Sequence, residues 1–142
     1  LDAAAVEHLR RQGWMCPSSL PGPLDLVDAR RDPRSGVLHL SYADGIDSLS
    51  LFQQRGRLDE DRLRGYRRDA VAGHRVWTHR ELPGRVVWSE DGMVYTVVAD
   101  TAQRTVERAV AALYRASDTG GGRWDRLSRG LNQVASWFNP LD

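Results

Sequence analysis

Two aspartate–glycine turns, each set between runs of alternating apolar and polar residues, constrain the fold of this chain most. They lie at Asp44-Gly45 and at Asp91-Gly92. Glycine tolerates the positive φ of a tight turn, and alternation with a period of two is typical of a half-buried strand. The turns join the runs 37–42 and 46–52 in the first case, and 85–88 and 93–99 in the second. The sequence therefore predicts two antiparallel hairpins.

Two further runs, 24–31 and 74–79, alternate in the same way and extend the predicted sheet. We expect a small, mostly antiparallel sheet of about five or six strands. Residues 16–24 contain prolines, which lack a backbone donor, and are expected to form an extended connector. The charged stretch 57–69 forms either a short helix, which its acidic start would favour, or a solvated loop, and the sequence does not decide between the two.

Helical periodicity flanks the strand runs on both sides. Residues 2–12 are rich in helix formers, with Asp2 placed to cap the first turn and Gly13 to end the last. A second helix is predicted over 101–117, with Asp100 as its cap. Its apolar residues recur at spacings typical of a helix packed on a sheet: Val106, Ala109, Val110, Leu113 and Tyr114. The fold class that follows is α+β.

A glycine-rich segment divides the chain in this interpretation. Residues 1–118 form the α+β domain, 119–123 a glycine-rich linker and 124–142 an amphipathic tail helix. Apolar aromatic residues at the end of a helix often mark a docking surface. Three tail residues are therefore expected to contact a partner protein: Arg129, Trp137 and Phe138. Because the chain begins at Leu1, we expect it to be a piece of a longer protein.

The charged residues exclude several kinds of function. All 20 basic side chains are arginine, so no lysine is present to form a Schiff base or to hold a phosphate. The 19 acidic residues leave a net charge of +1, which argues against a nucleic-acid partner. No apolar run reaches the roughly 20 residues that a membrane span needs.

Few residues are candidates for catalysis or metal binding. The single cysteine, Cys16, allows no internal disulfide and no thiolate metal cluster. It would act as a nucleophile only if the fold brought a base such as His39 close, which leaves a small hydrolase as an alternative to a structural cysteine. The four histidines are His8, His39, His74 and His79. No two of them have the spacing of zinc hydrolase motifs. We expect no catalytic residue, no metal and no cofactor.

The first hairpin carries a family resemblance. An apolar strand, then Tyr-x-Asp-Gly, then a strand with serine and phenylalanine resembles the C-terminal domain of the RseB/MucB proteins. The matching residues are Leu40, Tyr42, Asp44, Gly45, Ile46, Ser50, Leu51 and Phe52. The segment 14–24 and the run 86–100 with the helix after it resemble the same family, so the match covers residues 15–115. Ala43 and Ile46 depart from the usual serine and leucine.

This resemblance implies a regulatory function without catalysis. Family members control sigma-E-type sigma factors in the envelope stress response, and their C-terminal domain contacts an anti-sigma factor and protects it from proteolysis. The implied partner is the extracytoplasmic segment of an anti-sigma factor, and the implied location is periplasmic or elsewhere in the cell envelope. Lipid binding would belong to a LolA-like N-terminal domain of the family.

The binding mode and one alternative stay open at this point. Addition of a partner strand to a sheet edge is one mode for such a domain. We expect the hairpin residues Tyr42, Asp44, Gly45, Ser50 and Phe52 to determine the fold rather than to bind. A lipid or lipoprotein carrier of the cell envelope is the alternative function, and it would need an apolar cavity lined by the sheet. A homo-oligomer is compatible with the sequence.

Overall fold

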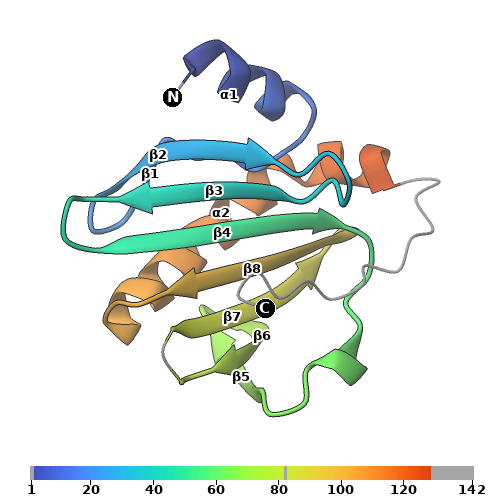
Figure 1. Ribbon diagram of the computed structural model, residues 1–142. Helices are drawn as coiled ribbons and strands as arrows, with labels where there is room; N and C mark the ends of the chain where they lie inside the picture. Colours follow the sequence, from blue (N-terminus) through green and yellow to red (C-terminus); the bar gives the residue numbers. More distant parts are fainter. Residues whose placement is uncertain (1, 82, 129–142) are drawn as a thin grey trace.

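An antiparallel sheet with a helix on one face forms the body of the molecule (Figure 1). The computed structural model describes the backbone of residues 2–81 and 83–128, and side chains as far as Ala116. Helix α1 (Ala3–Arg11) precedes the sheet and helix α2 (Gln103–Ser128) follows it. The strands are β1 (Ser19–Leu20), β2 (Leu24–Arg31), β3 (Leu38–Ala43), β4 (Ser48–Arg55), β5 (Arg67–Val71), β6 (His74–His79), β7 (Gly84–Glu90) and β8 (Met93–Ala99). The α+β class is confirmed, but the sheet has eight strands instead of five or six.

The two strands that the alternation did not indicate, β1 and β5, lie at the two edges of the sheet. β1 is two residues long and falls inside the proline-containing connector. β5 begins with three charged residues, Arg67, Arg68 and Asp69, so its sequence shows no alternation of apolar and polar residues. Edge strands commonly carry charge because charge discourages non-specific pairing between sheet edges. Part of the charged stretch before β5 forms a 3-10 turn, η1 (Glu60–Arg62), which Asp59 caps.

Two meanders of four strands meet at the centre of the sheet, in the order β1-β2-β3-β4-β8-β7-β6-β5. β4 pairs with β8 from Leu49 opposite Ala99 to Arg55 opposite Met93. The connector after β4 must therefore reach the far edge before the second meander begins. On the way its Leu63 packs with side chains of β7 and β8 that point away from α2.

Both predicted hairpins are present, and their turns have the expected geometry. In the first, Asp44 Oδ1 accepts hydrogen bonds from the backbone N–H groups of Ile46 and Asp47, at 2.8 and 2.7 Å. In the second, Asp91 and Gly92 have φ values of 50° and 80°. Two successive residues with positive φ characterise the turn type that best matches the twist of a hairpin.

Helix α1 agrees with its prediction, whereas α2 differs at both ends. Asp2 accepts a hydrogen bond from the N–H of Ala4, and Gly13 adopts a φ of 95° after the helix. In α2 the carbonyl of Ala102 accepts the first helical bonds, so Asp100 does not cap it. At the other end α2 continues to Ser128 and includes the glycines that were expected to form a linker.

The division into the segments 1–118, 119–123 and 124–142 stays a prediction. The structure places 119–123 within α2, and the tail from residue 129 onward lies outside the described residues.

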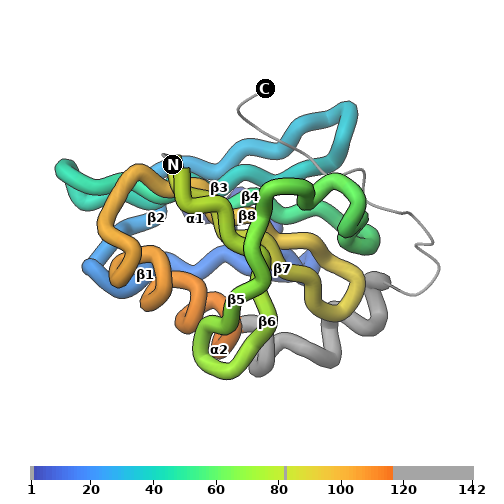
Figure 2. The backbone as a smooth tube through the Cα atoms, turned by 90° about the horizontal axis from the view of Figure 1, so that it is seen from below, coloured from blue at the N-terminus to red at the C-terminus, as the bar shows by residue number. Residues whose placement is uncertain are grey.

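The main core lies between the sheet and α2 (Figure 2). Ala109, Val110 and Leu113 are fully buried on the helix, as its periodicity predicts. On the sheet side, Trp88 stacks between Tyr95 and Tyr114 with ring centroids 5.2 Å apart in each pair. Offset stacking of this kind contributes roughly 0.5–1.5 kcal/mol per pair beyond the area buried.

Two side chains of the sheet hold the connector between α1 and β1. Gln53 is fully buried, donates to the carbonyl of Met15 at 2.7 Å and accepts from its N–H at 3.1 Å. The hydroxyl of Tyr42 donates to the carbonyl of Pro17 at 2.7 Å. The connector forms no long strand, so these bonds replace the pairing that a strand would have supplied.

We predict that Gln53→Leu lowers the free energy of unfolding by about 1–3 kcal/mol, because it leaves two buried backbone groups of Met15 unpaired. Gln54→Leu, one residue along the same strand and on the other face, is the matched control. It should change the stability by less than about 0.5 kcal/mol. Urea denaturation of both variants measures the difference. Equal losses in the two variants would contradict the role given to Gln53.

We predict that the protein loses stability in acid, because three aspartates have lowered pKa values in the folded state. Backbone N–H groups lower the pKa of Asp32, Asp44 and Asp69 in the folded protein. A lowered pKa adds stability above the unfolded value of about 3.9 and loses it as the pH falls through the folded value. The urea concentration at half-unfolding should therefore decrease as the pH is lowered from about 6 to about 3. Asp44→Asn keeps an acceptor oxygen in the turn and should make that fall smaller; an unchanged fall would argue against Asp44.

Candidate protein-binding site

The five hairpin residues singled out in the sequence lie on two faces of the sheet and in one turn. Tyr42 is fully buried on the α2 side, and burial raises its pKa. Asp44 and Gly45 form the turn, where Gly45 has a φ of 97°. Ser50 and Phe52 alternate to the opposite face of β4. Each of the five has a structural place, which fits the expectation that they act in the fold; that expectation stays a prediction.

On that opposite face Ser50 and Phe52 meet His39 of β3. His39 Nε2 lies 2.9 Å from Ser50 Oγ, and the imidazole stacks on the Phe52 ring at 4.3 Å between centroids. Burial is the main cause that lowers the pKa of His39. The neutral imidazole is therefore favoured, and it serves here as a packed ring with two hydroxyl neighbours, those of Ser50 and Ser41.

The structure does not bring together the two residues that the hydrolase alternative needs. Cys16 belongs to the buried core on the α2 side, whereas His39 points to the other face. Burial also raises the pKa of the Cys16 thiol to about 11, which disfavours the thiolate that a nucleophile requires. Among the residues that the structure describes, no group of three or more histidine, cysteine or acidic side chains is arranged to hold a metal ion.

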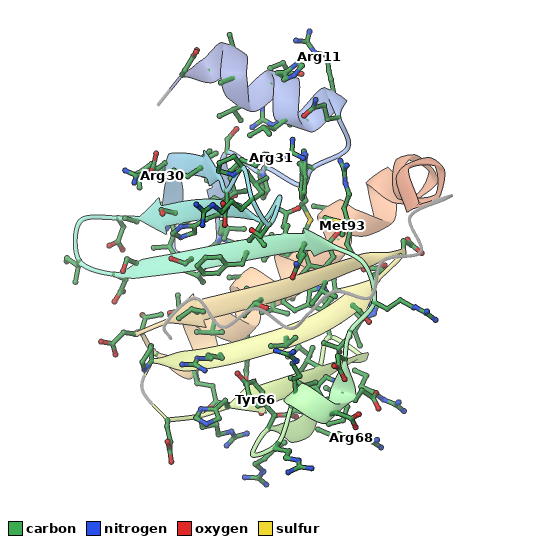
Figure 3. All side chains as sticks on the ribbon, turned by 45° about the vertical axis from the view of Figure 1, so that its right-hand side comes forward. Arg11, Arg30, Arg31, Tyr66, Arg68 and Met93 are labelled. Carbon is green, nitrogen blue, oxygen red and sulfur yellow. The ribbon has the colours of Figure 1, made fainter. Side chains whose placement is uncertain are left out.

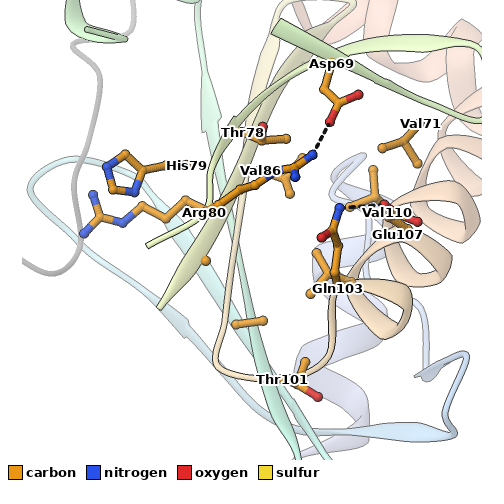
Figure 4. A pocket seen from close by; sticks show the side chains of 14 residues that line it. Asp69, Val71, Thr78, His79, Arg80, Val86, Thr101, Gln103, Glu107 and Val110 are labelled. Carbon is orange, nitrogen blue, oxygen red and sulfur yellow. Dashed lines mark hydrogen bonds and ion pairs between the residues drawn. The ribbon is translucent and has the colours of Figure 1, made fainter. Parts of the chain in front are cut away.

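A cavity of about 240 Å³ lies between the first turns of α2 and the strands β5 to β8 (Figure 4). Its apolar wall consists of side chains from β5, β7, β8 and α2: Val71, Val86, Ala99, Val106 and Val110. Val106 and Val71 are only partly buried. The space is thus suited to an apolar side chain rather than to a large cofactor, since ligand pockets usually exceed about 300 Å³.

Polar groups surround the apolar wall of this cavity. Arg80 Nη2 lies 3.3 Å from Asp69 Oδ2, and Gln103 donates to Glu107 at 3.0 Å. Thr78, which is 9% exposed, lines the cavity, and its hydroxyl has no hydrogen-bond partner. A ligand with one polar group beside an apolar body would meet both kinds of surface.

Strand β5 borders the cavity and is an edge of the sheet. It pairs with β6 on one side and is the last strand in the order. The N–H of Ala70 donates to Asp69 Oδ1 at 2.8 Å instead of to β6, so this donor belongs to the outer side of the strand. Arg67 and Arg68 are exposed on the same strand, and Figure 3 shows Arg68 at this edge. The edge therefore presents a basic surface and a backbone donor held by a neighbouring side chain.

Sequence reasoning did not find this site. Its lining comes from β5, β6, β7, β8 and α2. The sequence predicted the last three strands and the helical periodicity around Val106 and Val110, but neither β5 nor the cavity. The partner contacts expected at Arg129, Trp137 and Phe138 lie outside the described residues.

Comparisons with known proteins do not assign the chain to a family. No family model, no curated protein and no solved structure matches it. The similarity to the RseB/MucB proteins therefore stays a prediction from the hairpin residues. Within residues 2–81 and 83–128, no helix has both the length and the apolar character to cross a membrane.

The buried thiol yields a direct test of the structural role of Cys16. A pKa of about 11 instead of 9.0 leaves a roughly hundredfold smaller thiolate fraction near neutral pH. We predict that an aromatic disulfide reagent modifies native Cys16 at least a hundred times more slowly than the urea-unfolded chain at pH 8. The absorbance of the released thiolate measures both rates. A native rate within tenfold of the unfolded rate would show a reactive thiol instead.

Proposed function

We propose that this chain is a non-enzymatic protein-binding domain that takes up an extended segment of a partner at strand β5. The observation that carries this proposal is the single-sided edge strand with a cavity directly beside it. Extended peptides bind to such edges through main-chain hydrogen bonds, while pockets for alternate side chains supply specificity. In this arrangement one apolar side chain of the partner fills the cavity under α2.

The bonds at the edge describe how the partner would enter. A carbonyl of the incoming strand would replace Asp69 as the acceptor for the N–H of Ala70. Asp69 would keep its ion pair with Arg80, so no charge would be left unpaired by the exchange. The exposed Arg67 and Arg68 favour a partner segment with acidic residues next to its apolar one.

We further propose a regulatory partner, the extracytoplasmic segment of an anti-sigma factor, so that binding controls an extracytoplasmic sigma factor. This identification rests on the resemblance of the hairpin around Tyr42, Asp44 and Gly45 to the RseB/MucB proteins. An extracytoplasmic location is part of the same proposal. The contacts expected from Arg129, Trp137 and Phe138 would add to the edge rather than replace it.

A lipid or lipoprotein carrier is the less favoured alternative. A carrier needs a continuous apolar cavity along the sheet, and the cavity under α2 does extend over β7 and β8. Ion-paired and hydrogen-bonded side chains surround it, however, and the core beyond it is filled by the stacked rings of Trp88, Tyr95 and Tyr114. These features suit one side chain better than an acyl chain.

We predict that Val106→Phe weakens partner binding at least tenfold, because the new ring occupies the space that a partner side chain would fill. Burying one aliphatic side chain contributes about 1.5–3 kcal/mol, and 1.4 kcal/mol corresponds to a factor of ten. Binding of purified anti-sigma factor ectodomains, measured by calorimetry, gives the affinity. Unchanged affinity in Val106→Phe would remove the cavity from the proposal.

Val27→Phe is the matched control. Val27 is 50% exposed at an irregularity of β2, at the other side of the sheet, and the substitution adds the same bulk there. It should leave the affinity unchanged. If both variants lost binding equally, added apolar surface and not the cavity would be the cause.

A further inference from the structure

Two arginine side chains lie over the indole of Trp14 at one end of the sheet. The Cζ atom of Arg55, the last residue of β4, is 4.6 Å from the ring centroid, and that of Arg31, the last residue of β2, is 5.3 Å away. Their cross-strand neighbours Leu38 and Met93 are buried in the core under α2. Both arginines therefore leave the sheet on the α2 side, at the end opposite to the cavity.

Neither guanidinium has an acidic partner among the described residues. The ion pairs that the described residues form use other arginines: Arg10, Arg30, Arg62 and Arg80. Arg55 Nε is buried and has no hydrogen-bond partner, and the same holds for Trp14 Nε1. Burial, followed by the charge of Arg31, lowers the pKa of Arg55. Two cations and two unused donors thus share one small region.

The interactions within this cluster do not compensate these charges. A cation over an aromatic ring is only weakly attracted to it, whereas the partly buried guanidinium of Arg55 loses solvation without gaining a counter-charge. The two guanidinium groups also repel each other. An anion beside the cluster would be attracted by both charges and could accept hydrogen bonds from the guanidinium groups.

We propose that Arg31, Arg55 and Trp14 form a binding site for a carboxylate that an acidic side chain of the partner protein carries. We choose a carboxylate because a guanidinium group can donate two parallel hydrogen bonds to it, and two such groups lie in this region. The proposal rests on the protein-binding function and adds a second contact to it. β4 and β5 are four strands apart, or about 19 Å, so this contact is distinct from the β5 edge.

The test follows the indole N–H resonance of Trp14 during titration with an acidic peptide. The probes are acetyl-tetraglutamate amide, the corresponding tetraglutamine peptide and inorganic phosphate. The resonance of Trp14 is assigned by its loss in Trp14→Phe. We expect a saturable shift with tetraglutamate and none with tetraglutamine. Calorimetry of the same peptides gives a second readout that needs no assignment.

Arg55→Gln and Arg31→Gln should each weaken tetraglutamate binding at least fivefold. Arg31 is exposed, so its substitution leaves the fold intact even if Arg55→Gln disturbs it. Arg108→Gln is the matched control, because Arg108 is also an exposed arginine and lies on α2, outside both proposed contacts. It should leave the Trp14 shift and the affinity unchanged.

Three results would overturn the proposal. They are no Trp14 shift with tetraglutamate, an equal shift with tetraglutamine, or an equal loss of affinity in Arg108→Gln. A shift with phosphate and none with tetraglutamate would overturn the carboxylate assignment in favour of a free oxyanion. These titrations use no partner protein, so their failure is distinct from a failure of the Val106→Phe experiment.

Discussion

The pairing of β4 with β8 is the interaction on which the rest of the structure depends. Each flanking meander is a local arrangement of hairpins, but only the bonds between these two strands make one sheet of them. The continuous surface that results is wide enough for α2 to bury Ala109, Val110 and Leu113 on it. The core therefore depends on a contact between strands that are distant in the sequence.

The same topology creates both candidate binding regions. Because the second meander begins at the far edge, β5 is left with one neighbour and comes to lie beside the first turns of α2. At the opposite end of the sheet the first meander holds the connector between α1 and β1 through Gln53 and Tyr42. These anchors position Trp14 between the ends of β2 and β4, where Arg31 and Arg55 reach it.

The two regions offer a partner different interactions. The β5 edge supplies backbone bonds and space for an apolar side chain, which favour affinity for an extended segment. The cluster around Trp14 supplies charge that forms no ion pair with the side chains the structure describes, and such charge contributes to specificity and orientation more than to affinity. A segment with an apolar residue and a separate acidic residue would satisfy both. Arginine is well suited to binding an acidic residue because its guanidinium group is planar, holds its donors in fixed positions and stays charged.

The sequence by itself determined the local elements. The turns at Asp44-Gly45 and Asp91-Gly92, helix α1 and the buried stripe of α2 follow from φ preferences, capping and periodicity, which act over a few residues. Strand β5 was missed because charged edge residues carry no alternation. The start of α2 was missed because the sequence offered Asp100 as a cap, whereas the carbonyl of Ala102 accepts the first helical bonds. Only the tertiary structure decided the central pairing, the cavity and the cluster around Trp14. Each of these joins residues from separate strands, and a pattern along the chain contains no record of which strands become neighbours.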